Sequence, residues 1–281
     1  MTPRPENLAP RARPWRPAPA IRLSLLLHVA GVAALVLQPS HWPWVLGGLA
    51  TNHLLLIAAV LWPRGRVLGP NLVRLPSAAA ARNEVSLNFD DGPDPEVTPR
   101  VLDLLDRHRA RASFFCIGEK AAAFPELVKE IARRGHSVEN HTHRHASTFA
   151  FYGLGRLRRE VEAAQAAIAG IIGRAPEFFR APAGFRSPLL DPVMAACGLH
   201  YVSWTRRGFD TVHGNADAVL RRLTRGLAPG DILLLHDGTS ARTRAGEPVV
   251  LAVLPALLDR LAARGLKPVT LTEACRDEST A

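Results

Sequence analysis

Two apolar runs without a charged residue constrain this chain more than any other feature. Residues 23–63 contain no Asp, Glu, Lys or Arg. Residues 21–37 and 45–62 form apolar runs of 17 and 18 residues, close to the shortest helix that crosses a bilayer core of about 30 Å. Two prolines in the connection between the runs would end both helices. The sequence therefore predicts a transmembrane helical hairpin over residues 21–63.

Arginine flanks the predicted hairpin on both sides and is absent from its connection. Residues 1–20 are rich in Pro and Arg without a helical or strand period, and we expect a disordered basic tail there. Arg64, Arg66 and Arg74 follow the second run, so both ends of the hairpin are predicted to face the cytoplasm. A single signal anchor with the domain outside and a soluble amphipathic arrangement remain as alternatives. A cleaved signal peptide would need one shorter run and a cleavage site.

The overall composition excludes several other classes of protein. The 281 residues include 35 Lys+Arg against 25 Asp+Glu, but no dense basic run interleaved with aromatics, so no nucleic-acid partner is predicted. Cys116, Cys197 and Cys275 are too few and too widely spaced for a disulfide framework or a zinc cluster. We expect them to be buried thiols in a reducing compartment.

Beyond a linker at residues 64–82, strand-like and helix-like segments alternate. Strands are expected at residues 84–89, 111–117, 136–140, 177–180, 200–204, 231–235 and 268–271. Helices are expected at residues 98–108, 124–134, 154–172, 217–227 and 250–264. This alternation predicts a parallel sheet covered by helices. We therefore expect an α/β fold, a distorted and incomplete (β/α)7–8 barrel over residues 83–275, followed by a short tail at residues 276–281.

Residues suited to catalysis follow these expected strands, at the end where barrel enzymes carry their sites. They are Asp90 and Asp91 after the first strand, His141 and His145 after the third, Arg180 after the fourth, Asp210 beyond the fifth and His236 after the sixth. Taken singly, an Asp-Asp-Gly-Pro sequence is also a common turn, and a His after a buried strand is also a common structural cap. Their joint placement favours an active site.

One carboxylate and two imidazoles form a set that binds a divalent metal ion with open positions. His141 and His145 stand four residues apart, so they share a face if the segment is helical, and His143 between them points elsewhere. A water bound to such an ion is acidic enough to attack an acyl carbon near neutral pH. A second carboxylate can act as general base, and another His can protonate a leaving nitrogen. The residues thus favour metal-dependent hydrolysis of an amide.

Five ordered motifs resemble those of the NodB-homology polysaccharide deacetylases, carbohydrate esterase family 4. They are Leu87-Asn-Phe-Asp-Asp-Gly-Pro93, His141-Thr-x-x-His145, Arg180-Ala-Pro-Ala-Gly184, Trp204 through Asp210, and Leu233-Leu-Leu-His-Asp237. The resemblance covers residues 83–275 and implies removal of an N-acetyl group from an amino sugar.

The resemblance also implies a role for each matched residue. Asp90 would be the general base and His236 the general acid. Arg180 would orient the base, and Asp210 would tune the acid. The ligands of the metal, zinc or another divalent ion such as Co, Ni or Mn, would be Asp91, His141 and His145.

Two motifs depart from the family pattern. Ala183 stands where relatives often carry Tyr. The backbone N–H expected to hold the oxyanion beside Pro182 is unaffected, but a side-chain contact to sugar is lost. The fourth motif, which ends at Asp210, is matched loosely.

The sequence therefore predicts a membrane-anchored, multi-pass protein of the bacterial inner (cytoplasmic) membrane. It would hydrolyse the N-acyl amide, acetyl or formyl, of an amino sugar in a polysaccharide or a lipid-linked glycan. Some relatives deformylate a lipid-linked amino sugar on the cytoplasmic face, so an acylated amino-sugar glycolipid is the expected substrate class. The alternative is a membrane-anchored carbohydrate-binding protein without turnover, which would not need the full set of acid, base and ligands. A metal-dependent phosphoesterase would prefer further carboxylates for a second ion, and the motifs contain none.

Overall fold

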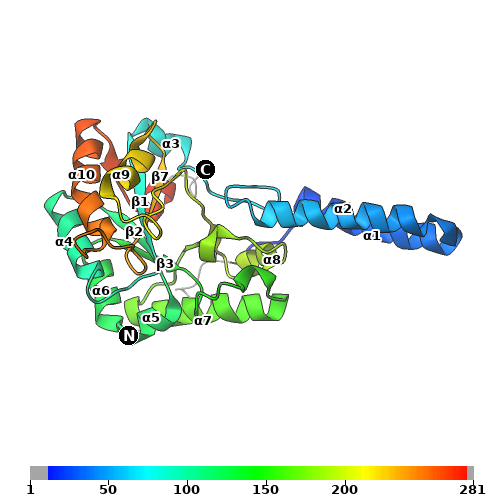
Figure 1. Ribbon diagram of the computed structural model, residues 1–281. Helices are drawn as coiled ribbons and strands as arrows, with labels where there is room; N and C mark the ends of the chain where they lie inside the picture. The colour runs from blue at the N-terminus through cyan, green and yellow to red at the C-terminus, as the bar shows by residue number, and fades with distance from the viewer. Residues whose placement is uncertain (1–11, 277–281) are drawn as a thin grey trace.

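The computed structural model describes residues 12–276 and shows a helical hairpin that projects from an α/β barrel (Figure 1). Helices α1 (Pro19–Leu37) and α2 (Trp42–Val60) pack against each other, with the 3-10 turn η2 (Pro39–His41) between them. Both are long and apolar enough to cross a membrane, a test that a signal sequence near the N-terminus also passes. Most of their large apolar side chains are exposed. An apolar surface of this extent marks an interaction with a membrane or a partner.

The predicted disordered tail is only partly described. Residues 1–11 lie outside the described residues. Residues 12–18 run beside α8 (Leu190–Ala196), where the Arg13 N–H donates to the Ala195 carbonyl at 2.9 Å. The Arg13 guanidinium donates to the Leu199 carbonyl at 2.6 Å. This part of the tail therefore makes specific contacts with the barrel, because its main chain and Arg13 find acceptors near the end of α8.

A parallel sheet forms the centre of the barrel. Its strands are β1 (Glu84–Asp90), β2 (Ala112–Cys116), β3 (Ser137–Asn140), β4 (Phe178–Phe179), β5 (His200–Tyr201), β6 (Arg206–Arg207), β7 (Ile232–His236) and β8 (Lys267–Pro268). The order is β5-β4-β3-β2-β1-β7-β6, and β8 pairs with β1. One run of chain, residues 200–207, supplies both edge strands of this path, and so it curls the sheet into an incomplete barrel. The predicted fold class is confirmed.

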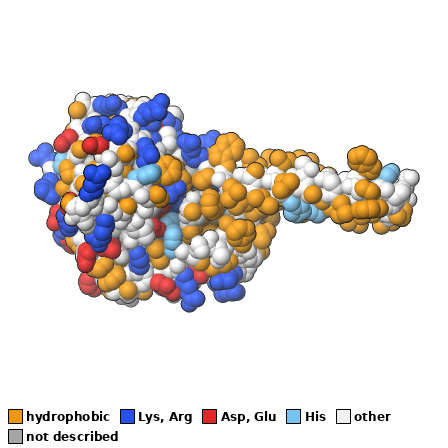
Figure 2. Space-filling model, in the orientation of Figure 1, with side chains coloured by type: hydrophobic (Ala, Val, Ile, Leu, Met, Phe, Trp, Pro, Cys, Tyr) orange, Lys and Arg blue, Asp and Glu red, His pale blue; other side chains and the backbone are white. Residues whose placement is uncertain are grey.

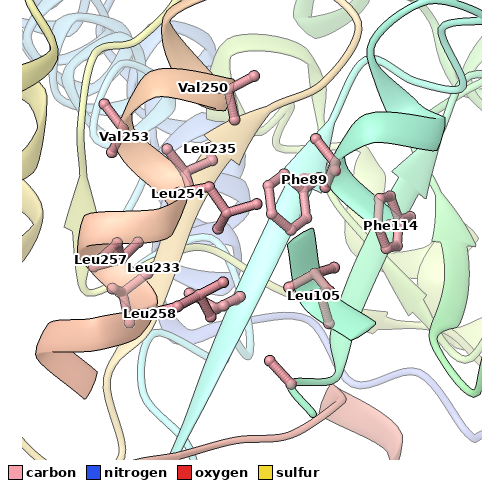
Figure 3. Packing of buried hydrophobic residues seen from close by; sticks show 14 of the residues in the cluster. Phe89, Leu105, Phe114, Leu233, Leu235, Val250, Val253, Leu254, Leu257 and Leu258 are labelled. Atoms are coloured by element: carbon pink, nitrogen blue, oxygen red, sulfur yellow. The ribbon is translucent and has the colours of Figure 1, made fainter. Parts of the chain in front are cut away.

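Helices cover the outside of the sheet (Figure 1). They are α3 (Ser77–Ala81), α4 (Thr98–Arg107), α5 (Gly118–Ala123), α6 (Pro125–Arg133), α7 (Leu154–Ile172), α8, α9 (Ala216–Thr224), α10 (Val249–Ala263) and α11 (Leu271–Cys275), with short turns η3 (Phe149–Phe151) and η4 (Pro182–Gly184). The main core lies between the sheet and α4, α9 and α10. Figure 3 shows Phe89 of β1 between Leu254 of α10 and Phe114 of β2, and the two phenyl rings stack at 5.0 Å. The apolar faces of strands and helices thus meet as the alternation predicts.

The segment after the hairpin packs into the barrel wall. Leu72 forms a parallel bridge with Val202, and the Ser203 N–H donates to the Leu72 carbonyl at 2.9 Å. Leu75 and Ala79 are buried in a second apolar cluster of the barrel. Residues 64–82, predicted as a linker, therefore complete the barrel at the place where its edge strands meet. The segment has little hydrophobic periodicity, so the sequence gives no sign of this role. Its packing against the edge strands accounts for the difference.

The last strand and the burial of two cysteines differ from the prediction. The last predicted strand, residues 268–271, is shorter, because Thr270 and Glu273 form a capping box that starts α11 there. Of the three cysteines, Cys116 is buried, whereas Cys197 and Cys275 are half-buried.

Candidate active site

The first motif ends β1 in a turn that requires glycine. Asp91 adopts a positive φ of 71°, and Gly92 follows it. A Cβ atom on Gly92 would lie 2.4 Å from Asp237 Oδ2, closer than two such atoms can approach. The end of β7 therefore packs directly against the Asp90-Asp91 turn, and both strand ends contribute to one site.

His141 and His145 meet through a loop, which corrects the helical arrangement considered from their spacing. Thr142 has φ 66° and His145 has φ 52°, values that no α-helix contains. The Thr142 hydroxyl accepts the His145 N–H at 3.0 Å and closes the loop. The two imidazole rings lie 4.7 Å apart, centroid to centroid. His143 packs beside Gly118, where a Cβ would lie 2.6 Å from His143 Nδ1, so it stays outside the pair as expected.

Asp91, His141 and His145 form a cluster with the geometry of a metal centre. Each offers one ligand atom, and these atoms lie within 4.8 Å of one another. Asp91 Oδ1 lies 3.2 Å from His141 Nε2 and 3.0 Å from His145 Nε2. Asp91 Oδ1 is buried and has no hydrogen-bond partner among residues 12–276. A buried carboxylate oxygen without a hydrogen-bond donor would be stabilised by a cation bound next to it.

The protonation of the cluster also suits a cation. His141 Nδ1 lies 2.8 Å from the Arg180 carbonyl oxygen and must donate to it. In the neutral ring, His141 Nε2 therefore presents a lone pair to Asp91 Oδ1, and a shared divalent ion would stabilise these two facing acceptors. Burial raises the pKa of Asp91, but when both imidazoles are protonated, their contacts with Asp91 outweigh this effect, and the pKa of Asp91 lies well below its usual range. Asp91 is thus a carboxylate, as a ligand must be.

Asp90 is held beside the cluster by Arg180. The Arg180 guanidinium is fully buried and donates to Asp90 Oδ1 and to Asn88 Oδ1, both at 2.6 Å, and to the Ser203 carbonyl at 2.8 Å. The other carboxylate oxygen of Asp90, Oδ2, lies 3.8 Å from His141 Nε2. One oxygen of Asp90 is therefore fixed by Arg180, while the other faces the cluster.

His236 and Asp210 form a second pair at the end of β7. Asp210 Oδ1 accepts from His236 Nδ1 at 2.9 Å, and Asp210 Oδ2 accepts the His236 backbone N–H at 2.7 Å. Burial lowers the pKa of His236, but the charge and hydrogen bond of Asp210, together with the charges of Asp90 and Asp91, outweigh it, and the net shift is upward. The loosely matched fourth motif thus places Asp210 where it orients the imidazole and favours its protonated form.

The predicted oxyanion loop lies at the exposed rim of the site. Pro182 and Ala183 belong to η4, after the end of β4. Ala183 is exposed and has φ 54°. The Tyr201 hydroxyl donates to the Gly184 carbonyl at 3.1 Å and fixes the end of the loop. The loop is therefore supported from below, although its Ala side chain is small.

Two polar residues of the site, Thr239 and Lys120, were not predicted, and Asp237 of the fifth motif was given no role. The Thr239 hydroxyl donates to Asp91 Oδ2, and Lys120 Nζ donates to the Asp91 carbonyl at 2.8 Å. Asp237, next to His236, is buried, and burial raises its pKa to about 7. Asp237 ends the fifth motif and Thr239 lies two residues beyond it, so the motif is the sequence signal that could have identified both. No sequence signal connects Lys120, at the start of α5, with the site.

An α/β barrel with acidic and imidazole side chains gathered at the carboxyl ends of its strands defines a class of hydrolases. A family model described as polysaccharide deacetylase matches residues 77–202. The chain is 31% identical to a peptidoglycan-N-acetylglucosamine deacetylase of Bacillus cereus over 196 residues, 68% of this chain and 88% of the relative. It is 36% identical to a chitooligosaccharide deacetylase of Sinorhizobium fredii, over 66% of this chain and 91% of the relative. The chain belongs to the polysaccharide deacetylase family.

A solved structure agrees with this assignment. A peptidoglycan N-acetylglucosamine deacetylase in complex with 4-naphthalen-1-yl-N-oxidanyl-benzamide superposes with a TM-score of 0.64 at 30% identity. The match covers 73% of this chain and 92% of the solved chain. The predicted family is therefore confirmed, as is the predicted enzyme class, a hydrolase of carbon–nitrogen bonds outside peptides.

Proposed function

We propose that this protein is a metal-dependent deacetylase that removes the acetyl group from N-acetylglucosamine units of a glycan. The observation that carries the proposal is the convergence of Asp90, its β-sheet partner His236 and the Asp91, His141 and His145 cluster at one end of the barrel. The named relatives act on peptidoglycan and on chitooligosaccharides. Their shared chemical group, the N-acetyl amide of an amino sugar, is the bond we assign to this site.

The residues divide the work of amide hydrolysis between two sides of the site. A divalent ion bound by the cluster, zinc in our proposal, would polarise the acyl carbonyl and lower the pKa of the attacking water. Asp90 Oδ2 faces that position and accepts the proton of the water, while Arg180 fixes Asp90 Oδ1. His236, held protonated by Asp210, donates a proton to the leaving nitrogen. The Ala183 N–H at the rim stabilises the oxyanion.

We further propose that α1 and α2 anchor the enzyme in the inner membrane with the barrel on the cytoplasmic side. Both helices are free of Asp, Glu, Lys and Arg from Leu23 onward, and arginines stand at the hairpin's two barrel-side ends. Trp42, Trp44 and Trp62 are exposed near helix ends, where membrane interfaces favour indole rings. A barrel held at that face would meet amino sugars carried on lipids.

Two substitutions separate the enzyme from a carbohydrate-binding protein without turnover. Asp90→Asn should keep the bound metal and lower kcat by at least about 100-fold, because the base is lost and the ligands are not. His141→Ala should lose both metal and activity. Metal content is measured on purified protein, and acetate release is measured from N-acetylglucosamine oligomers with added Zn²⁺ or Co²⁺. An Asp90→Asn variant as active as the wild type would show that the assigned base is wrong.

A further inference from the structure

The membrane hairpin enters the barrel at the rim of the active site. Pro63 lies three residues beyond α2, and its carbonyl accepts hydrogen bonds from the Ser203 hydroxyl and from Asn71 Nδ2. A Cβ atom on Gly184 would lie 2.8 Å from Pro63 Cβ. Gly184 is the neighbour of Ala183 in the predicted oxyanion loop. The base of the hairpin and the mouth of the barrel are therefore in contact.

This joint leaves little freedom between hairpin and barrel. The Arg64 guanidinium donates to the Thr205 carbonyl at 3.3 Å, and the Leu72 N–H donates to the Tyr201 carbonyl at 3.0 Å. The segment is thus attached to the run of chain that joins the two edges of the sheet. The orientation of the hairpin relative to the mouth of the barrel is therefore fixed. A membrane crossed by the hairpin would meet the barrel at a fixed angle to that mouth.

Exposed apolar side chains continue from the hairpin onto the barrel (Figure 2). Phe151 is 84% exposed and Leu154 is 49% exposed, in the stretch that follows the metal-ligand loop. Leu189, 47% exposed, follows the oxyanion loop and precedes α8. Trp15, before α1, donates from Nε1 to Asp191 Oδ2 of α8 at 3.1 Å, which links this patch to the hairpin. We call Trp15, Phe151, Leu154 and Leu189 the apolar rim.

We propose that the apolar rim is seated in the membrane interface, so that the mouth of the active site opens on the bilayer surface. The rim's occupant is a lipid surface, because the rim is continuous with two helices that have the length and composition of spans. Arg66 lines the same groove as Trp15 of the rim and is placed to meet anionic headgroups. Resting on the proposed function, this seating gives a structural reason for the substrate class expected from the sequence, an N-acetylated amino sugar attached to a membrane lipid.

The first test compares two substrates with the full chain in lipid nanodiscs. One substrate is N-acetylglucosamine on an alkyl lipid, and the other is a soluble chitooligosaccharide. The double variant Phe151→Ser, Leu154→Ser should lower the ratio of lipid-linked to soluble turnover about tenfold. The matched control Phe124→Ser removes another exposed Phe, at the start of α6 on the side of the barrel away from the hairpin (Figure 1), and should leave the ratio unchanged. An unchanged ratio in the double variant would refute the seating.

The second test does not depend on turnover. Phe151→Trp and Phe124→Trp each add one indole, and brominated lipids in the nanodisc quench fluorescence of an indole that reaches the bilayer. Added fluorescence from residue 151 should be quenched, and that from residue 124 should not. Equal quenching, or a dimer that shields residue 151 from the lipids, would overturn the proposal. If neither substrate is turned over but residue 151 is quenched, the seating stands and the proposed function fails.

Discussion

His136 should make the barrel lose stability as the pH falls. It lies just before β3, is 3% exposed, and its Nδ1 accepts the Ala112 N–H at 3.2 Å. Protonation at Nδ1 would remove this acceptor and bury a charge beside Phe114. Burial accordingly lowers the pKa of His136 from 6.5 to about 4. In the unfolded chain His136 keeps the higher pKa. It therefore binds a proton at pH values at which His136 of the folded chain stays neutral.

The sign and the size of the effect follow from this difference. Below about pH 6.5 the unfolded state binds more protons, so the free energy of unfolding falls with the pH until about pH 4. A shift of about 2.5 pKa units amounts to about 3 kcal/mol in full, of which about 2 kcal/mol is lost between pH 7.5 and pH 5. For a barrel of this size that corresponds to a fall in Tm of about 4–8 °C.

The assay is urea unfolding of the full chain in detergent at pH 7.5 and pH 5, followed by near-ultraviolet circular dichroism. His136→Asn keeps an acceptor for the Ala112 N–H but cannot titrate, so its loss between the two pH values should be smaller by about 2 kcal/mol. His108→Asn, at the C-terminal end of α4 where His108 Nε2 lies 3.3 Å from Asp259 Oδ1, is the control and should not reduce the loss. Equal losses in wild type and His136→Asn would refute the reasoning.

Two further outcomes are expected. Asp210→Asn should lower kcat about 100-fold and move the basic limb of the pH–rate profile to lower pH, because His236 loses the nearest of the charges that raise its pKa; an unmoved limb would exclude His236 as the acid. A reporter fused after Ala281 should be active only when it is one that works in the cytoplasm; activity of a reporter that works only outside the membrane would reverse the proposed orientation.

The sequence predicted those parts of the fold that depend on local patterns. Residues 154–172 were predicted as a helix and form one with the same bounds, because the segment is amphipathic and a left-handed Gly173 caps its end. The two-residue strand at Arg206–Arg207 was missed, since charged residues on an edge do not resemble a strand. Helix α3 was missed because a short run of Ala has no apolar periodicity.

The site residues that lie at the ends of strands could be predicted from the sequence. Asp90, His141 and His236 end or follow buried strands, and the parallel sheet brings such ends together. The way in which the His pair meets was not predictable, because it depends on left-handed backbone at Thr142 and His145. The contact of Lys120 with the Asp91 carbonyl likewise depends on tertiary packing that no local pattern records.

The attachment of residues 63–75 to the barrel wall also limits the reach of the enzyme. If α1 and α2 cross a membrane as we propose, this attachment would hold the catalytic groups at one height above the bilayer, and they would act only on the sugars of a glycan that lie at that height. On a lipid-linked glycan extended at its far end, the sugars next to the lipid would stay within range and later units would lie beyond it. Distance from the lipid would therefore decide which sugars of the polymer are deacetylated.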